Sequence, residues 1–142
     1  MTDTIQAIET SYAGCRFRSR TEARVAVMLD AAGLPWEYEP EGFETTCGRY
    51  LPDFRVTLWP GKTWWLEVKP SNYVADDGDM GRWICLAMES GSTLVAVCGL
   101  GIHTIVVGVG GDVYSHAGYP GIFAAGHIAA GKSARFEYGE QG

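Results

Sequence analysis

Apolar residues recur at helical spacing in the segment SRTEARVAVMLDAAGLP. Between Val25 and Ala32 they follow the i, i+3, i+4, i+7 pattern of a helix that packs one face on a sheet. Ser19, with Glu22 three residues later, matches a capping box at the start, and Gly33 marks the end. The pattern predicts an amphipathic helix between Ser19 and Gly33.

Alternation replaces the helical spacing after this helix. PWEYEPEGFE alternates aromatic residues with glutamates and predicts a half-exposed first strand, which Pro40 and Gly42 end or bulge. RYLPDFRVTLW predicts a second strand over residues 49–59, PGK a turn, and TWWLEVKP a third strand over residues 63–70. The second and third strands are therefore expected to be antiparallel neighbours.

The rest of the chain adds a second helix and more strand. A polar loop is expected over residues 71–80, a helix over 80–91 and a strand buried on both faces over 93–100. A hairpin is expected over 103–116, turning at GVGGD, and a short helix or loops in the Gly- and Ala-rich tail from about Tyr119. This order predicts one mixed α/β domain over residues 1–142.

Composition fits an ordinary globular chain of one-domain length. The 142 residues are 46% hydrophobic and 20% charged, and no apolar run reaches the roughly 18 residues of a membrane span. The first residues carry no basic region typical of a signal peptide. We therefore expect no membrane association and a cytoplasmic location, in a bacterial or phage-infected cell.

The four cysteines, at positions 15, 47, 85 and 98, show no C-x-x-C spacing, and no histidine pair has metal-ligand spacing. A structural zinc site is therefore not favoured. In a cytosolic protein we expect all four to be reduced thiols, with Cys85 and Cys98 in apolar surroundings.

Basic residues concentrate in one short stretch of an acidic chain. The net charge of −6 argues against a large nonspecific nucleic-acid surface. Arg16, Arg18, Arg20 and Arg24 nevertheless lie within nine positions, and the last two share one helix face. These arginines either contact DNA phosphates or form a solvated basic arm that balances the acidic residues.

Three ionisable residues stand among the apolar residues of the second and third strands. Alternation places Trp65, Glu67 and Lys69 on one face of the third strand. In a hairpin centred near residues 60–61, Asp53 pairs roughly with Val68 and lies close to Glu67. Two neighbouring carboxylates are costly to bury, and a divalent cation such as Mg²⁺ supplies the compensating charge. The spacing therefore predicts a metal site suited to phosphodiester hydrolysis.

Each of these residues also has a structural explanation. Asp53 follows Pro52 and fits ordinary turn chemistry. Glu67 and Lys69 fit the solvated face of an edge strand, although Trp65 on the same face argues against it. Glu22 fits a capping box and favours the positive end of the helix dipole.

The motif LPDF, with thirteen residues between Asp53 and the glutamate of EVK, resembles the signature of the PD-(D/E)XK nuclease superfamily. The resemblance covers roughly residues 12–100, and RFRSRTEARVAVMLDAAGLPWEYEPEGF is similar to the front part of small phage-type nucleases. It implies a restriction-endonuclease-like αβββαβ core, here with an additional C-terminal hairpin and tail over residues 101–142. It also implies a metal-dependent DNA endonuclease.

The resemblance assigns roles to individual residues. Asp53 would be the central metal ligand and Glu67 the second, with the backbone carbonyl of Val68 as a further ligand. Lys69 would act on the attacking water, and Glu22 matches the helix glutamate of many members. The implied cofactor is Mg²⁺, for which Mn²⁺ can substitute.

The substrate and partners stay open at this point. Arg82, near the start of the helix after Lys69, is a further candidate for phosphate contact, because related nucleases carry polar residues there. A chain of 142 residues has little room for a recognition domain, which favours structure-selective, resolvase-like cutting. A homodimer would supply two sites for cutting both strands, and a protein partner could supply specificity.

Two other functions compete with the nuclease. One is a nucleic-acid-binding module that keeps the fold without cutting. The other is a protein-interaction or inhibitor protein, which the net charge and the acidic stretches at Glu37–Glu44 and Asp76–Asp79 would suit. The presence together of Asp53, Glu67 and Lys69 favours the enzyme over the binding module.

Overall fold

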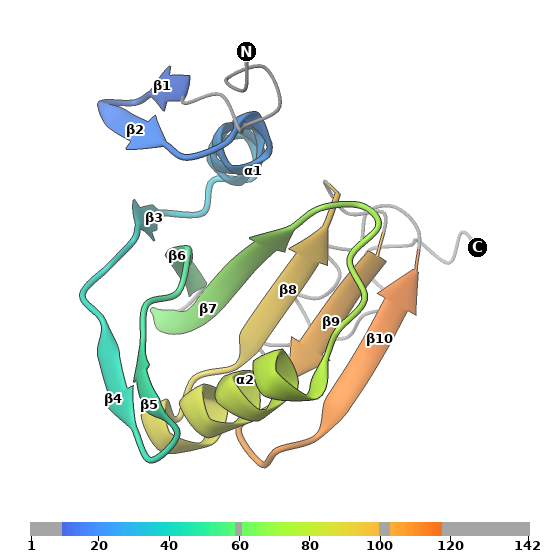
Figure 1. The fold of residues 1–142 in the computed structure, drawn as a ribbon. Helices are drawn as coiled ribbons and strands as arrows, with labels where there is room; N and C mark the ends of the chain where they lie inside the picture. Colours follow the sequence, from blue (N-terminus) through green and yellow to red (C-terminus); the bar gives the residue numbers. More distant parts are fainter. Residues whose placement is uncertain (1–9, 59–60, 100–102, 118–142) are drawn as a thin grey trace, which may run out of the picture.

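The computed structural model describes residues 10–58, 61–99 and 103–117. Its centre, within these ranges, is a six-stranded sheet in the order β10-β9-β8-β7-β6-β3 (Figure 1). β7 and β8 run parallel and the other neighbours run antiparallel, which confirms the mixed α/β class. The strands of this sheet are β3 (Trp36–Tyr38), β6 (Phe54–Leu58), β7 (Lys62–Lys69), β8 (Leu94–Cys98), β9 (His103–Val107) and β10 (Val113–Ala117).

Helices α1 (Arg20–Ala31) and α2 (Asp77–Ser90) each pack into a different hydrophobic cluster. Alternation along β7 sends Trp64 and Leu66 into the cluster that contains α1, and Trp65 into the cluster that contains α2. Figure 1 shows α2 in front of the sheet. The central strand β7 is therefore covered on both faces.

The ends of the two helices follow local capping chemistry. α1 begins after Ser19, whose Oγ accepts a hydrogen bond from the Glu22 N–H, as the sequence predicts. α2 begins three residues before the predicted position of 80, because the Asp76 side chain caps it by accepting from the Asp79 N–H. The expected loop over residues 71–80 is therefore shorter, and Gly91 ends α2 in the left-handed conformation.

The first two predicted strands are each broken in two. The first becomes β3 and β4 (Phe43–Thr45), separated around Pro40 and Gly42 as expected. The second becomes β5 (Gly48–Tyr50) and β6, separated around Pro52. β4 and β5 pair only with each other in the described structure, and this hairpin lies outside the main sheet.

A hairpin near the start of the described chain was not predicted. β1 (Thr10–Tyr12) pairs with β2 (Cys15–Phe17), and the turn between them places Gly14 at a φ of 81°. Phe17 is fully buried in the cluster that contains α1, and this burial attaches the hairpin to the core.

The C-terminal part of the described sheet follows the prediction. β8 is buried along its whole length, and β9 and β10 form the hairpin expected over residues 103–116. Gly108 and Asp112 close its turn through the Gly108 N–H and the Asp112 carbonyl. The expected short helix or loops from about Tyr119 lie outside the described residues. Among the helices of the described ranges, none is long and apolar enough to cross a membrane.

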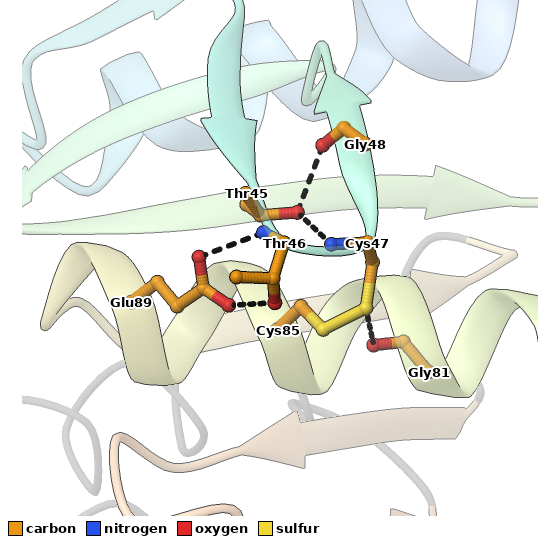
Figure 2. The surroundings of a disulfide bond; sticks show 7 residues. All are labelled: Thr45, Thr46, Cys47, Gly48, Gly81, Cys85 and Glu89. Carbon is orange, nitrogen blue, oxygen red and sulfur yellow. Dashed lines mark hydrogen bonds between the residues drawn. A yellow bond between two sulfur atoms is a disulfide. The ribbon is translucent and has the colours of Figure 1, made fainter.

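The expectation of four reduced cysteines is wrong. A disulfide joins Cys47, at the turn of the β4–β5 hairpin, to Cys85 on α2 (Figure 2). Cys15 and Cys98 are free thiols. The two bonded residues are 38 positions apart, so no local spacing indicated the pair. Beside the disulfide, the N–H and hydroxyl of Thr46 donate to the Glu89 carboxylate.

Candidate functional site

The break between β5 and β6 places Asp53 against the end of β7. Phe54 pairs with Leu66, so the register continues to Asp53 opposite Glu67, one residue from the predicted pairing with Val68. The Asp53 N–H donates to Glu67 Oε2 at 3.1 Å, and the Val68 N–H donates to Asp53 Oδ2 at 2.8 Å. Each carboxyl group is therefore held by a backbone N–H of the opposite segment.

Burial disfavours the charged form of both carboxyl groups. Glu67 is only 3% exposed, and this burial, followed by the nearby charge of Asp53, raises the pKa of Glu67 to about 8. Burial is also the largest cause that raises the pKa of Asp53, to about 6. The pair thus retains a proton near neutral pH, and a divalent cation is the kind of charge that would favour full ionisation.

Tyr50, which the sequence did not indicate, is hydrogen-bonded to Glu67. Tyr50 ends β5, and its hydroxyl accepts a hydrogen bond from Trp83 Nε1 at 3.0 Å. A hydrogen bond between the Tyr50 side chain and Glu67 lowers the pKa of Glu67, and burial raises the pKa of Tyr50. The hydroxyl therefore stays protonated and can donate to the carboxylate. Its contacts depend on the placement of α2, so no local pattern in the sequence indicated it.

Lys69 completes the predicted group of three at the end of β7. Its positive charge lowers the pKa of both Asp53 and Glu67. The Lys69 Nζ lies 5.2 Å from the ring centre of Tyr73 and 5.9 Å from that of Trp83. The structure thus brings Asp53, Glu67 and Lys69 together, as the alternation of the third strand predicts.

Glu22 lies in the first turn of α1 and is buried. Its Oε1 accepts hydrogen bonds from the Tyr38 hydroxyl at 2.7 Å and from the Arg18 N–H at 3.1 Å. Its charge raises the pKa of Asp53, so the structure places it near the candidate site. The sequence predicted either a capping-box role or a metal-site role for Glu22. Its hydrogen bonds show a structural role, although its carboxylate accepts from the backbone N–H of Arg18 rather than from that of Ser19.

The arginines lie on both sides of the sheet. Arg18 pairs with Glu39, with 2.7 Å between Nε and Oε2, and Arg82 pairs with Asp79 within α2. The other predicted DNA contacts, Arg16, Arg20 and Arg24, are exposed on β2 and α1. The arginines from Arg16 to Arg24 thus lie on the α1 side of the sheet, whereas Arg82 lies on α2.

Glu39 is a further acidic residue at this site that the sequence did not identify. Its backbone has a φ of 48°, and its N–H donates to the Asp53 carbonyl at 2.7 Å. Its negative charge raises the pKa of Asp53, while its own carboxylate is paired with Arg18. A left-handed conformation at a non-glycine residue is not visible in a hydrophobic pattern.

The donor set of Asp53 and Glu67 fits a magnesium ion. Mg²⁺ is commonly bound by one or two protein carboxylates, with waters and phosphate oxygens completing its octahedron. Within residues 10–58, 61–99 and 103–117, no three His, Cys, Asp or Glu side chains cluster as metal ligands. Asp53 and Glu67, with the Val68 carbonyl that the resemblance implies, would be the protein ligands held on β7 and the segment before β6.

No protein-family model matches the chain, and no curated protein matches it either.

Proposed function

We propose that the protein is a metal-dependent DNA endonuclease that hydrolyses phosphodiester bonds. The observation that carries the proposal is the hydrogen-bonded pair of the half-buried Asp53 and the buried Glu67, with Lys69 beside it. The order of the helices and main-sheet strands up to β8 is α1-β3-β6-β7-α2-β8, with the β4–β5 hairpin inserted after β3. This order supports the proposal, because it is compatible with the αβββαβ order of the PD-(D/E)XK superfamily. On this proposal the core is restriction-endonuclease-like.

Asp53, Glu67 and the Val68 carbonyl would hold the cation. When bound, Mg²⁺ or Mn²⁺ supplies a Lewis acid that polarises a phosphate oxygen and lowers the pKa of a bound water. The backbone N–H groups of Asp53 and Val68 fix the two carboxyl groups beforehand, so little reorganisation is needed. Glu22 would complete the ligand set after release from Tyr38 and Arg18.

Lys69 would act on the reacting groups directly. Its ammonium donates hydrogen bonds and carries a fixed positive charge, so it can orient the attacking water and stabilise charge that develops on the phosphate. Its effect on the pKa values of Asp53 and Glu67 supports a position beside the expected metal ligands.

DNA would be positioned by its phosphates. Arg16, Arg18, Arg20 and Arg24 offer charge on the α1 side without reading bases. This arrangement suits an enzyme that selects a DNA structure, such as a flap or a four-way junction, rather than a long sequence.

The test is cleavage of labelled single-stranded, duplex, flap and four-way-junction DNA in Mg²⁺, in Mn²⁺ and in EDTA. Cleavage should require metal and fall by about 100-fold or more in Lys69→Ala, because a positioned acid–base group contributes on that scale. Lys62→Ala is the matched control, since Lys62 is exposed at the other end of β7. Cleavage in EDTA, or equal loss in both variants, would contradict the proposal.

A second candidate is a nucleic-acid-binding module that does not cut. The engagement of Glu22 by Tyr38 and Arg18 favours it, because that carboxylate is then unavailable to a metal. Metal binding and DNA binding by a folded protein that cleaves no substrate would support this alternative.

A further inference from the structure

The ammonium group of Lys69 faces two aromatic rings. Its Nζ lies 5.2 Å from the ring centre of Tyr73 and 5.9 Å from that of Trp83. The two rings are 6.0 Å apart and inclined by 39°. The two distances from the Lys69 Nζ lie within the range over which the electron-rich face of a ring attracts a cation. Tyr73 and Trp83 thus form an aromatic corner around the end of this long side chain.

Two sets of hydrogen bonds fix the Tyr73 side of this corner. The Tyr73 N–H donates to the Pro70 carbonyl at 3.1 Å, which turns the chain back toward the end of β7. The Tyr73 hydroxyl is hydrogen-bonded to Asp79, which also pairs with Arg82 at 2.5 Å. Burial is the largest cause that raises the pKa of Tyr73, so its hydroxyl keeps its proton and this bond. The ring is therefore attached to the first turn of α2.

An aromatic ring and a carboxylate hold an ammonium group in different ways. An ion pair engages N–H donors, whereas a ring attracts the charge through its quadrupole. The donors of Lys69 then remain available to a water or a phosphate oxygen. Lysine also has a long, flexible stem, and confining it beforehand reduces the entropy lost when the reaction requires one position.

We propose that Tyr73 is a positioning residue, which acts by holding the Lys69 ammonium beside Asp53 and Glu67. This inference rests on the proposed nuclease function for its effect on the reaction. Trp83 shares the contact, but it is fully buried and also bonds Tyr50, so its replacement would disturb the core. Tyr73 is the residue at which the contact can be tested.

The kinetic test compares two substitutions of one residue. Tyr73→Leu removes the ring, whereas Tyr73→Phe keeps it and loses only the hydroxyl. We expect kcat to fall by about tenfold in Tyr73→Leu with KM within about twofold, and Tyr73→Phe to retain most of kcat. Tyr114→Leu is the matched control, because Tyr114 is 51% exposed on β10. Equal loss in Tyr73→Leu and Tyr73→Phe would overturn the role of the ring.

A spectroscopic test measures the contact without any cleavage. The chain has three lysines, Lys62, Lys69 and Lys132, so reductive ¹³C-methylation, which keeps the positive charge, gives few signals to assign with Lys→Arg variants. The Lys69 methyl signal should lie upfield of that of the exposed Lys62 because of the rings. It should move toward the Lys62 position in Tyr73→Leu and stay in Tyr73→Phe.

The two tests separate the two proposals. A Lys69 signal that does not move in Tyr73→Leu would overturn the positioning role even if the protein cleaves DNA. A signal that moves as expected in a protein without cleavage would support the contact and count against the nuclease.

Discussion

At the scale of single residues, Asp53 and Glu67 show how a backbone can present two like charges. The N–H of Asp53 binds Glu67, and the N–H of Val68 binds Asp53. Each bond favours the charged form of one carboxyl group, while burial favours the neutral form. Because burial has the larger effect on both, the metal-free pair should be sensitive to pH.

The stability of the metal-free protein should fall as the pH rises from about 4.5 to 8. The pKa of Glu67 is about 8 in the folded protein against 4.5 for an ordinary glutamate, so in this interval the folded state binds more protons than the unfolded state. The contribution of Glu67 to the free energy of unfolding is complete below pH 4.5 and is lost as the pH rises through 8. Thermal unfolding in EDTA across this range measures it.

Glu67→Gln provides the control for this pH dependence, because the amide cannot ionise. Its melting temperature should depend less on pH than that of the original protein. If the two proteins show the same slope, the pH dependence arises from other groups.

At the scale of elements, the β4–β5 hairpin depends on α2 for its position. The Cys47–Cys85 disulfide and the bonds from Thr46 to Glu89 join the two (Figure 2). The bond between Trp83 and Tyr50 joins them as well. The hairpin leads directly into the segment that carries Asp53. The attachment of the hairpin to α2 therefore affects the position of Asp53.

Reduction should lower the free energy of unfolding by about 4 kcal/mol, the effect expected from releasing a closed loop of this size. Cys47 is exposed, so a small thiol can reach the bond. Urea unfolding with and without dithiothreitol measures the effect, and the Cys47→Ser/Cys85→Ser variant is the control that should not respond. Four titratable thiols in unreduced, denatured protein would contradict the bond itself.

The predictability of the elements depended on whether their signals were local. α1 was predictable because Ser19, its apolar spacing and Gly33 all lie within one segment. The alternation of β7 likewise predicted which residues share a face with Glu67. The division of the second strand at Pro52 and the pairing of Cys47 with Cys85 depend on distant parts of the chain, so the pattern did not show them.

At the scale of the whole molecule, an acidic chain must concentrate its positive charge if it binds DNA. The net charge is −6, yet Arg16, Arg18, Arg20 and Arg24 lie together on the α1 side. The candidate carboxylates could be predicted from spacing, whereas Tyr50 and Tyr73 became visible only when α2 was placed against the sheet.

Replacing Arg20 and Arg24 by alanine should weaken DNA binding at all sequences alike. Each lost phosphate contact lowers the salt dependence, so the slope of log K against log salt should become shallower by about 2 for duplex DNA. Fluorescence anisotropy in EDTA at several salt concentrations measures this.

Arg49→Ala is the matched control, because Arg49 is exposed on the β4–β5 hairpin and pairs with Glu44. An equal change in the control would show that the α1 side has no special part in binding. An unchanged slope in the double variant would place the DNA elsewhere.

The disulfide also changes the connectivity of the chain. From Cys47 to Cys85 the polypeptide is a closed covalent ring, and Asp53, Glu67 and Lys69 all lie within it. A single protease cut inside this ring opens it but leaves one molecule, which separates into fragments only on a reducing gel. A cut outside the ring gives a separate fragment on a denaturing gel even without reduction. The candidate ligands would therefore remain covalently joined by a second route even after the backbone between them is broken.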